Sequence, residues 1–382
     1  MKKTFFHMIP VMLSVLMLLS VLAPCLAAEE SRIVPVTEPR LVVETEGLSP
    51  EDAERKLANS ELIQKLFFDM FWAEEFAEDF DPEFTIDLPF APPGVPQHMD
   101  PFNTQVYMAW LRRSVHTWEI DPTNHELYGT PDPDLFFLIS YVKGDVTWGG
   151  NDGVFSSKRI DMIRLQDGKV CYVREWTNPL EWLYAAGREV PIFHVDLEDE
   201  RVAEMHEIMF PSDAEPMEPE ELDMSEEAIA ARFAQNIAFM NGEEGAEEID
   251  GANYINRVLF MPPEMYEPET YEADEWMASW SVASILGGEE SDLIDDLGMP
   301  LGYGGCSVYE TDDPLIYFNE SSYVDVCDWI GNGTGPSYYR NWYIHVYRFN
   351  PDGTIQQGEE HLNPINKFNC INVSIPSFPY FY

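Results

Sequence analysis

Hydrophobic residues recur at helical spacing at two corresponding places in this chain. One run follows Ser49-Pro50 and the other follows Ser225, and acidic residues come directly after each start. A serine at the N-cap and acids in the first turn favour the beginning of a helix. The pattern therefore predicts a helix at the start of each half of the chain. The apolar positions that repeat every three or four residues are Leu62, Leu66 and Met70, then Ile229, Phe233 and Ile237.

Extended segments rich in apolar residues make up most of the remainder of each half. In both halves a short one ends in Pro-Pro and precedes a second helical pattern. Asp167-Gly168 and Asp352-Gly353 separate later segments and are typical of hairpin turns. Helices followed by antiparallel strands indicate an α+β fold. The predicted strands are 84–93, 135–146, 158–165, 170–176, 254–263, 315–326, 339–349 and 355–361, and the second helices are 104–117 and 274–286.

The matching patterns come with matching residues. Residues 167–193 align without a gap to residues 352–378, with seven of 27 positions identical. A second block contains Trp110 and recurs 170 positions later, where it contains Trp280. Solenoid repeats span about 20–50 residues, so a repeat this long indicates a duplicated domain instead. The expected organisation is a linker at 29–48, a first domain at 49–210, an acidic Pro-rich linker at 211–223 and a second, more divergent domain at 224–382.

The N-terminal residues have the pattern of a secretory signal peptide. Lys2 and Lys3 precede an apolar run, and small residues end at Ala28. Such a segment is cleaved on export, so residues 1–28 are expected to be absent from the mature protein, which would be secreted or extracytoplasmic. Cys25 weakly resembles the acceptor of a lipoprotein anchor, but Pro24 fits that motif poorly. No later segment is long and apolar enough to predict a transmembrane helix.

Composition narrows the class of partner. The chain has 22 basic and 69 acidic side chains, for a formal net charge of −47. This charge excludes the basic surface of a nucleic-acid-binding protein and argues against docking on anionic membranes. Zinc spacing, phosphate-binding glycine loops and nucleophile elbows are absent from the sequence, so no metal or cofactor is predicted. Four cysteines remain after export, and they allow three disulfide pairings: Cys171, Cys306, Cys327 and Cys370.

Two motifs carry a family resemblance. Phe90-Ala-Pro-Pro-Gly94 follows the first strand, and Arg174-Glu175-Trp-Thr-Asn178-Pro ends the first domain before a Val-Pro. This order resembles the SnoaL-like families of the nuclear-transport-factor-2-like superfamily, and the phenazine-biosynthesis A/B proteins most of all. The resemblance covers 49–193 well and 225–382 more weakly. It implies two tandem cones, each a curved antiparallel sheet wrapped around helices and open on an apolar pocket. Members include isomerases, cyclases and dehydratases of ring ketones, and binding proteins.

The resemblance assigns a pocket-facing acid to Glu175, which the internal repeat matches to Glu360. A carboxyl in an apolar cone has a raised pKa, so it can exchange protons or hydrogen-bond a ligand near neutral pH. The helix position that is His in the related proteins is Tyr107 in the first copy and Met277 in the second. A nearby Ser is kept only as Ser281. The paired acid–base residues of those proteins are therefore not reproduced in either half.

Four further residues are candidates, each with a structural alternative. Trp110 and Trp280 share a helical face with apolar neighbours, and this spacing favours core packing over ligand stacking. Asp161 and His345 lie on the strand before the Glu strand. Either they are surface residues, or they pair across the hairpin with the glutamates, as a carboxyl pair in the first copy and a His–Glu pair in the second.

Three functions remain open at this point. The first is binding of a small apolar or aromatic molecule in the first cone, with Glu175 facing Tyr107 and Trp110 across an apolar gap. The second is an interaction protein whose cones are filled by side chains. The third is a cofactor-free isomerase or cyclase that uses Glu175 or Glu360. A phenol titrates near 10, so Tyr107 suits holding a ligand oxygen better than removing a proton, which favours binding. A homodimer or pairing of the two cones is also expected.

Overall fold

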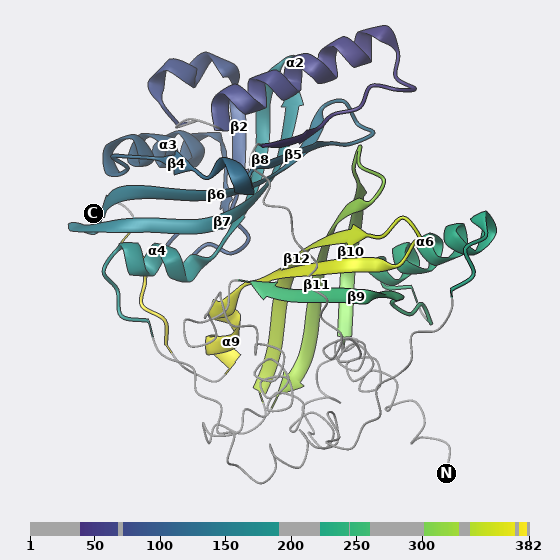
Figure 1. The fold of residues 1–382 in the computed structure, drawn as a ribbon. Helices are drawn as coiled ribbons and strands as arrows, with labels where there is room; N and C mark the ends of the chain where they lie inside the picture. Colours follow the sequence, from purple (N-terminus) through teal and green to yellow (C-terminus); the bar gives the residue numbers. More distant parts are fainter. Residues whose placement is uncertain are drawn as a thin grey trace. The chain divides into compact units, whose positions relative to one another are not determined.

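The structure, a computed structural model, contains two mixed β-sheets with accompanying helices (Figure 1). The α+β prediction is confirmed, and two sheets fit the two predicted cones. The predicted signal segment, most of the predicted linker at 211–223 and the predicted helix with Trp280 and Ser281 lie outside the described residues. The described residues are 39–67, 72–190, 222–243, 245–259, 302–327, 337–370 and 374–379.

The chain divides into two compact units. The first unit contains residues 33–190 together with 309–316 and 375–382, and the second unit contains the rest. The sequence places the two short segments 309–316 and 375–382 in the second domain, yet they group with the first unit. The domain bounds otherwise stay a prediction.

The first unit is built on an eight-stranded sheet. Its order is β1-β5-β6-β7-β8-β2-β3, and β4 pairs with β6. Helix α3 packs against β2, β3 and β6, and α4 packs against β7 (Figure 1). The elements are β1 (Arg40–Val42), α2 (Pro50–Phe67), the 3-10 helix η1 (Glu74–Asp79), β2 (Phe80–Asp87), β3 (His98–Met99), α3 (Pro101–Ser114), β4 (Glu119–Ile120), the 3-10 helix η2 (Pro122–Asn124), β5 (Glu126–Gly129), β6 (Leu135–Trp148), β7 (Asn151–Gln166), β8 (Lys169–Thr177) and α4 (Pro179–Ala185).

The second unit holds a five-stranded sheet in the order β10-β11-β12-β13-β9. Ser225 begins its first helix as predicted, because its Oγ accepts a hydrogen bond from Ala228 N at 3.3 Å. The elements are α6 (Glu226–Met240), β9 (Asp250–Leu259), β10 (Gly302–Glu310), β11 (Ile316–Cys327), β12 (Ser337–Phe349), β13 (Ile355–Leu362) and α9 (Pro364–Cys370).

Local signals in the sequence account for where elements begin and turn. Ser49 caps α2, with its Oγ accepting from Asp52 N at 3.1 Å. Asp167 and Gly168 both have positive φ, as the predicted two-residue hairpin turn requires. Helix α3 begins at Pro101 and not at 104, because the Asp100 side chain caps Asn103 N and proline is favoured in the first helical turn.

The internal repeat is reproduced in strand register. Arg174 pairs with Asp87 between β8 and β2, and Glu359 pairs with Arg257 between β13 and β9. These partners are offset by 185 and 170 positions, which are the offsets of the two repeated sequence blocks. The next residue on each of β8 and β13 is Glu175 or Glu360. The two glutamates therefore occupy equivalent points on equivalent strands.

The ends of these strands also match. The side chain of Asn178 accepts a hydrogen bond from Leu180 N at 3.0 Å, and Asn363 accepts one from Ile365 N at 3.0 Å. Each Asn is followed by a proline and a short helix, α4 or α9. In both copies the Asn-Pro pair therefore ends the strand, and the same asparagine caps the helix that follows.

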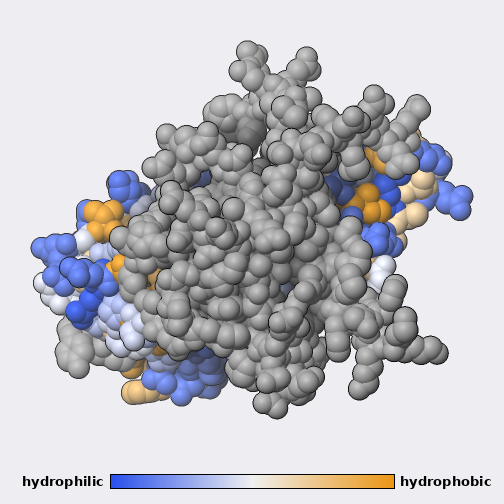
Figure 2. Space-filling view, turned by 90° about the horizontal axis from the view of Figure 1, so that it is seen from below, coloured by the Kyte–Doolittle hydropathy of each residue, from blue (hydrophilic) through white to orange (hydrophobic). Residues whose placement is uncertain are grey.

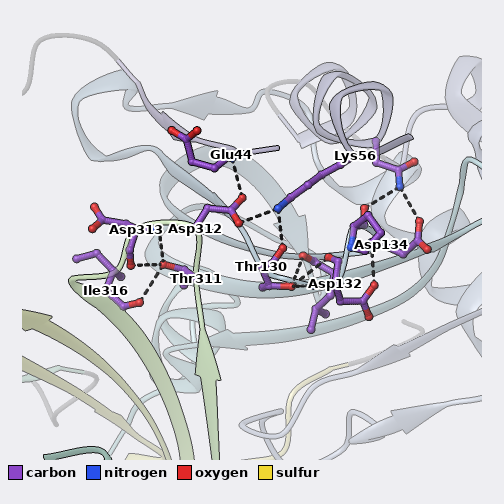
Figure 3. A network of polar contacts seen from close by, with 12 residues as sticks. Glu44, Lys56, Thr130, Asp132, Asp134, Thr311, Asp312, Asp313 and Ile316 are labelled. Atoms are coloured by element: carbon purple, nitrogen blue, oxygen red, sulfur yellow. Dashed lines mark hydrogen bonds and ion pairs between the residues drawn. The ribbon is translucent and has the colours of Figure 1, made fainter. Parts of the chain in front are cut away.

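A buried ion pair ties segment 309–316 into the first unit (Figure 3). Lys56 Nζ on α2 lies 2.7 Å from Asp312 Oδ1 and also donates to the Thr130 carbonyl at 2.7 Å. The Lys56 and Asp312 side chains are 1% and 7% exposed. Asp312 Oδ2 accepts a hydrogen bond from Glu44 N at 2.9 Å. Because both charges are removed from water, this pair is sensitive to loss of either partner.

The surface and the thiols of the described residues bear on three of the sequence predictions. The coloured part of the surface in Figure 2 is mainly hydrophilic, with separate hydrophobic residues. None of the helices in the described ranges could cross a membrane. Cys171 and Cys306 are free thiols, so none of the three complete disulfide pairings is formed. Cys171 Sγ instead lies 3.4 Å from the Arg164 carbonyl oxygen of the neighbouring strand.

Candidate functional site

The β7–β8 hairpin places Asp161 directly opposite Glu175. Opposed residues of an antiparallel pair point to the same face, so the predicted carboxyl pair is confirmed. The alternative that Asp161 is a surface residue is wrong, because Asp161 is 0% exposed and Glu175 is 8% exposed. Long flanking strands and buried neighbours remove both carboxyls from solvent.

Arg159 completes this group and was not predicted. Its Nε lies 2.8 Å from Asp161 Oδ2, and its Nη1 lies 3.7 Å from Glu175 Oε2. The guanidinium is 5.6 Å from the ring centroid of Phe67 and 5.8 Å from that of Trp118, which are cation–π distances. Arg159 stands two residues before Asp161 on the same strand, and this alternation was the signal that could have found it.

Burial and charge act in opposite directions on the carboxyl pair. Burial raises the pKa of Asp161, the Arg159 charge lowers it, and the Glu175 charge raises it further. Burial also raises the pKa of Glu175, against the lowering effect of Arg159. A single guanidinium faces two buried carboxyls, so the pair holds a proton at higher pH than free carboxyls do. The site can therefore donate a hydrogen bond from a carboxylic acid, or pass a proton.

A buried histidine lies in the electrostatic field of the same arginine. His125 is 1% exposed, and burial lowers its pKa to about 4, with a further lowering by the Arg159 charge. At neutral pH His125 is therefore uncharged. Its position just before β5 offered no recognisable pattern in the sequence.

An aromatic group adjoins the carboxyl pair. We call Trp110, Trp148 and Trp182 the tryptophan cluster. Trp148 lies 5.5 Å from Trp110 and 5.6 Å from Trp182 between ring centroids. Trp182 Nε1 donates to Thr177 Oγ1 at 3.0 Å, and Thr177 stands two residues after Glu175 on the same face of β8. The cluster therefore begins next to Glu175 on the sheet.

Tyr107 and Trp110 take part in packing contacts. Their rings are stacked at 5.8 Å, and Tyr107 also stacks on Trp182 at 6.4 Å. Both are at least 95% buried. Trp110 thus packs in the core, as its helical spacing favours. The contact between Tyr107 and Trp182, whose Nε1 bonds the Glu175 strand, connects Tyr107 to the carboxyl pair through an aromatic ring rather than across a gap.

Phe378, from the C-terminal part of the chain, inserts into the tryptophan cluster. Its ring centroid is 5.8 Å from Trp110, 5.4 Å from Trp148 and 5.5 Å from Trp182. The ring planes meet at 85°, 76° and 71°, so all three contacts are edge-to-face. Phe378 is 3% exposed, and it extends the cluster with a residue distant in sequence.

The second sheet carries the predicted His–Glu pair. His345 is opposite Glu360 in the β12–β13 register, with Nε2 3.4 Å from Oε2. Tyr343 and Tyr347 stack on either side of the imidazole at 5.7 and 5.6 Å. Burial raises the pKa of the Tyr347 hydroxyl, as do nearby acidic charges. His345 is buried at 6% exposure, so its surface alternative is wrong. Trp280 and Ser281 lie outside the described residues, and their roles stay predictions.

Within the described ranges, no group of three or more His, Cys, Asp or Glu side chains is placed to hold a metal ion. No family model matches the chain. An uncharacterized PhzA/B-like protein of Pseudomonas aeruginosa is 29% identical over 115 residues, which are 30% of this chain and 79% of that protein. This chain is similar to the phenazine-biosynthesis A/B proteins. The predicted resemblance is thereby confirmed, and most of one PhzA/B-like protein corresponds to less than a third of this chain.

Solved structures give further matches of the same kind. A phenazine biosynthesis-related protein from Pseudomonas aeruginosa is 21% identical, covers 38% of this chain and 94% of its own, and has a TM-score of 0.34. A protein assigned as a SnoaL-like polyketide cyclase from Jannaschia is 16% identical, covers 38% of this chain and 100% of its own, and has a TM-score of 0.29. An NTF2-like protein from Burkholderia xenovorans is 14% identical, covers 34% of this chain and 96% of its own, and has a TM-score of 0.28.

Proposed function

We propose that the first unit binds a small apolar or aromatic molecule whose oxygen accepts a hydrogen bond from the Asp161–Glu175 carboxyl pair. The observation that carries the proposal is the burial of two opposed carboxyls against a single arginine. Their shared proton supplies a donor inside an apolar surrounding, where a hydrogen bond to a ligand carbonyl is strong. Glu175 is the less buried of the two. It is therefore the carboxyl that contacts the ligand.

A catalytic role is the second candidate, and the raised pKa of both carboxyls favours it. A carboxyl whose pKa is raised by burial can hold a proton and move it to or from a ring ketone. An isomerase or cyclase would use Glu175 in this way, with Asp161 sharing the proton. Tyr107 stands where the related proteins have His, which leaves Glu175 without the second base. Binding is therefore the function that the site supports best.

Titration calorimetry with a panel of aromatic and polycyclic ketones tests the proposal. Glu175→Met removes the donor, and the loss of a hydrogen bond between two neutral groups, about 0.5–1.5 kcal/mol, weakens binding about 2- to 13-fold. Glu175→Gln weakens it less, because an amide N–H still donates. Glu360→Gln in the second sheet leaves the first site intact.

Glu119→Gln is the matched control, since Glu119 is an exposed glutamate of the same unit. Equal affinities for the wild type and Glu175→Met would reject the site. The catalytic candidate predicts turnover of a bound ketone by the wild type, and loss of that turnover in Glu175→Gln even where binding persists.

We also propose that the protein is exported after cleavage near Ala28. The basic start, the apolar run and the small residues at its end support this. Mass spectrometry of the protein from the culture medium should find an N-terminus near Glu29. Retention of Met1 would contradict export, and a lipid on Cys25 would indicate an anchored form instead.

A further inference from the structure

The tryptophan cluster has the properties of a binding site for one aromatic ring. Trp148 Nε1 donates to Ser114 Oγ at 3.1 Å, and Trp182 Nε1 donates to Thr177 Oγ1 at 3.0 Å. With these N–H groups engaged inside the protein, the rings of Trp148 and Trp182 are left for aromatic packing. Phe378 packs against both of them and against Trp110, in edge-to-face contacts. An aromatic ring is thus the chemical group that this cluster accepts.

The backbone of the first unit is shaped to hold residues 375–379, which belong to the same unit. Phe378 N donates to the Pro93 carbonyl oxygen at 2.7 Å. At Gly94, which has a φ of +97°, a Cβ would lie 3.0 Å from the Phe378 carbonyl oxygen. At Gly149, with a φ of +59°, a Cβ would lie 2.4 Å from Pro379 Cγ. Two glycines therefore permit this close approach, and only one backbone hydrogen bond with Pro93 accompanies it among the contacts found.

We propose that residues 375–379 are an internal occupant of the aromatic side of the ligand site, and that an external aromatic ring binds the tryptophan cluster by displacing Phe378. This inference rests on the proposed function, because it places the apolar part of the ligand beside the Glu175 carboxyl. Thr177 joins the two parts, since it bonds Trp182 and shares a strand face with Glu175.

The internal occupant lowers the affinity for the external ring by a calculable factor. A minor open state is commonly populated at about 0.1–10%. The apparent affinity of a ligand that binds only the open state is its intrinsic affinity multiplied by that fraction, so the internal occupant weakens binding about 10- to 1000-fold. Removing the Phe378 ring should raise the affinity for the external ring by the same factor.

The test uses the full chain and a neutral fluorescent probe, N-phenyl-1-naphthylamine. Phe378→Ala should bind the probe at least about tenfold more tightly than the wild type. Phe102→Ala is the matched control, because Phe102 is 74% exposed, and it should bind the probe as the wild type does. A peptide with the sequence of residues 374–379 should compete with the probe on Phe378→Ala, and the same peptide with Ala in place of its Phe should not.

A second measurement needs no variant. Saturating probe should speed hydrogen exchange of the Phe378 amide in the wild type, because displacement breaks its bond to Pro93. Equal probe affinity in wild type and Phe378→Ala, or an unchanged exchange rate at saturation, would overturn the inference. Failure of the proposed function has a different signature: Phe378→Ala binds the probe tightly, while Glu175→Met leaves ketone affinity unchanged.

Discussion

Removing the Lys56 ammonium should destabilise the first unit far more than removing an exposed lysine from the same helix. Lys56→Met leaves the Asp312 carboxylate buried without a cation and the Thr130 carbonyl without its side-chain donor. Loss of one partner of a buried ion pair costs about 3–5 kcal/mol. Total stabilities are about 5–15 kcal/mol, so this is a large share of the free energy of unfolding.

The same helix supplies a matched control. Lys65 Nζ lies 2.7 Å from Asp79 Oδ2, the same distance as in the Lys56 pair, but the Lys65 side chain is 55% exposed. Lys65→Met should cost only about 0–1 kcal/mol, because water screens the exposed pair. The difference between the two variants isolates the effect of burial at constant residue type and geometry.

Urea denaturation followed by tryptophan fluorescence measures both costs. Six of the ten tryptophans lie between residues 72 and 182 of the first unit, so the signal reports mainly on that unit. The double variant Lys56→Met/Asp312→Leu should recover much of the loss, since apolar replacement of both partners avoids an unpaired buried charge. Equal costs for Lys56→Met and Lys65→Met would refute the reasoning.

Three further predictions follow from burial and capping. The raised pKa of Asp161 and Glu175 means that the folded state holds protons more tightly than the unfolded chain. This pair therefore stabilises the folded state at a pH below the ordinary carboxyl pKa, and that stabilisation is lost as the pH rises through the folded-state pKa. Asp161→Asn should flatten the dependence of the free energy of unfolding on pH, measured by urea titrations at stepped pH. An unchanged dependence would contradict this prediction. The lowered pKa of His125 acts in the opposite sense, because its contribution to the stability of the folded state is present above about pH 6.5 and is lost as the pH falls toward about 4. His125→Gln should therefore reduce the loss of stability in acid, measured as the midpoint of thermal unfolding at each pH. Asn178→Ala and Asn363→Ala should each cost about 1 kcal/mol as lost helix caps in denaturant titrations, and no cost at either site would count against a shared strand-to-helix design.

The sequence alone determined the hairpin turns and indicated, as one of two alternatives, which residues could face each other across them. Asp167-Gly168 sets a two-residue turn, which by itself would place Asp161 opposite Arg174, and a register shift between Arg164 and Leu165 brings it opposite Glu175 instead. In the second copy a register shift between Arg348 and Phe349 likewise precedes the pairing of His345 with Glu360. The turns were predictable because their residues are local, whereas a shift of one residue in register decides which side chains oppose each other, and the sequence left that choice open.

Only the tertiary structure decided which distant side chains meet and which charges are buried. Lys56 and Asp312 are 256 positions apart, and no local pattern joins them. Phe378 comes from the last ten residues of the sequence, yet it completes a cluster begun by Trp110 on α3. Such contacts depend on how whole elements pack, and the raised pKa of Glu175 depends on the burial that this packing produces. The spacing of residues in the sequence relates only residues that are close along the chain, whereas the desolvation of a group depends on everything that surrounds it in space.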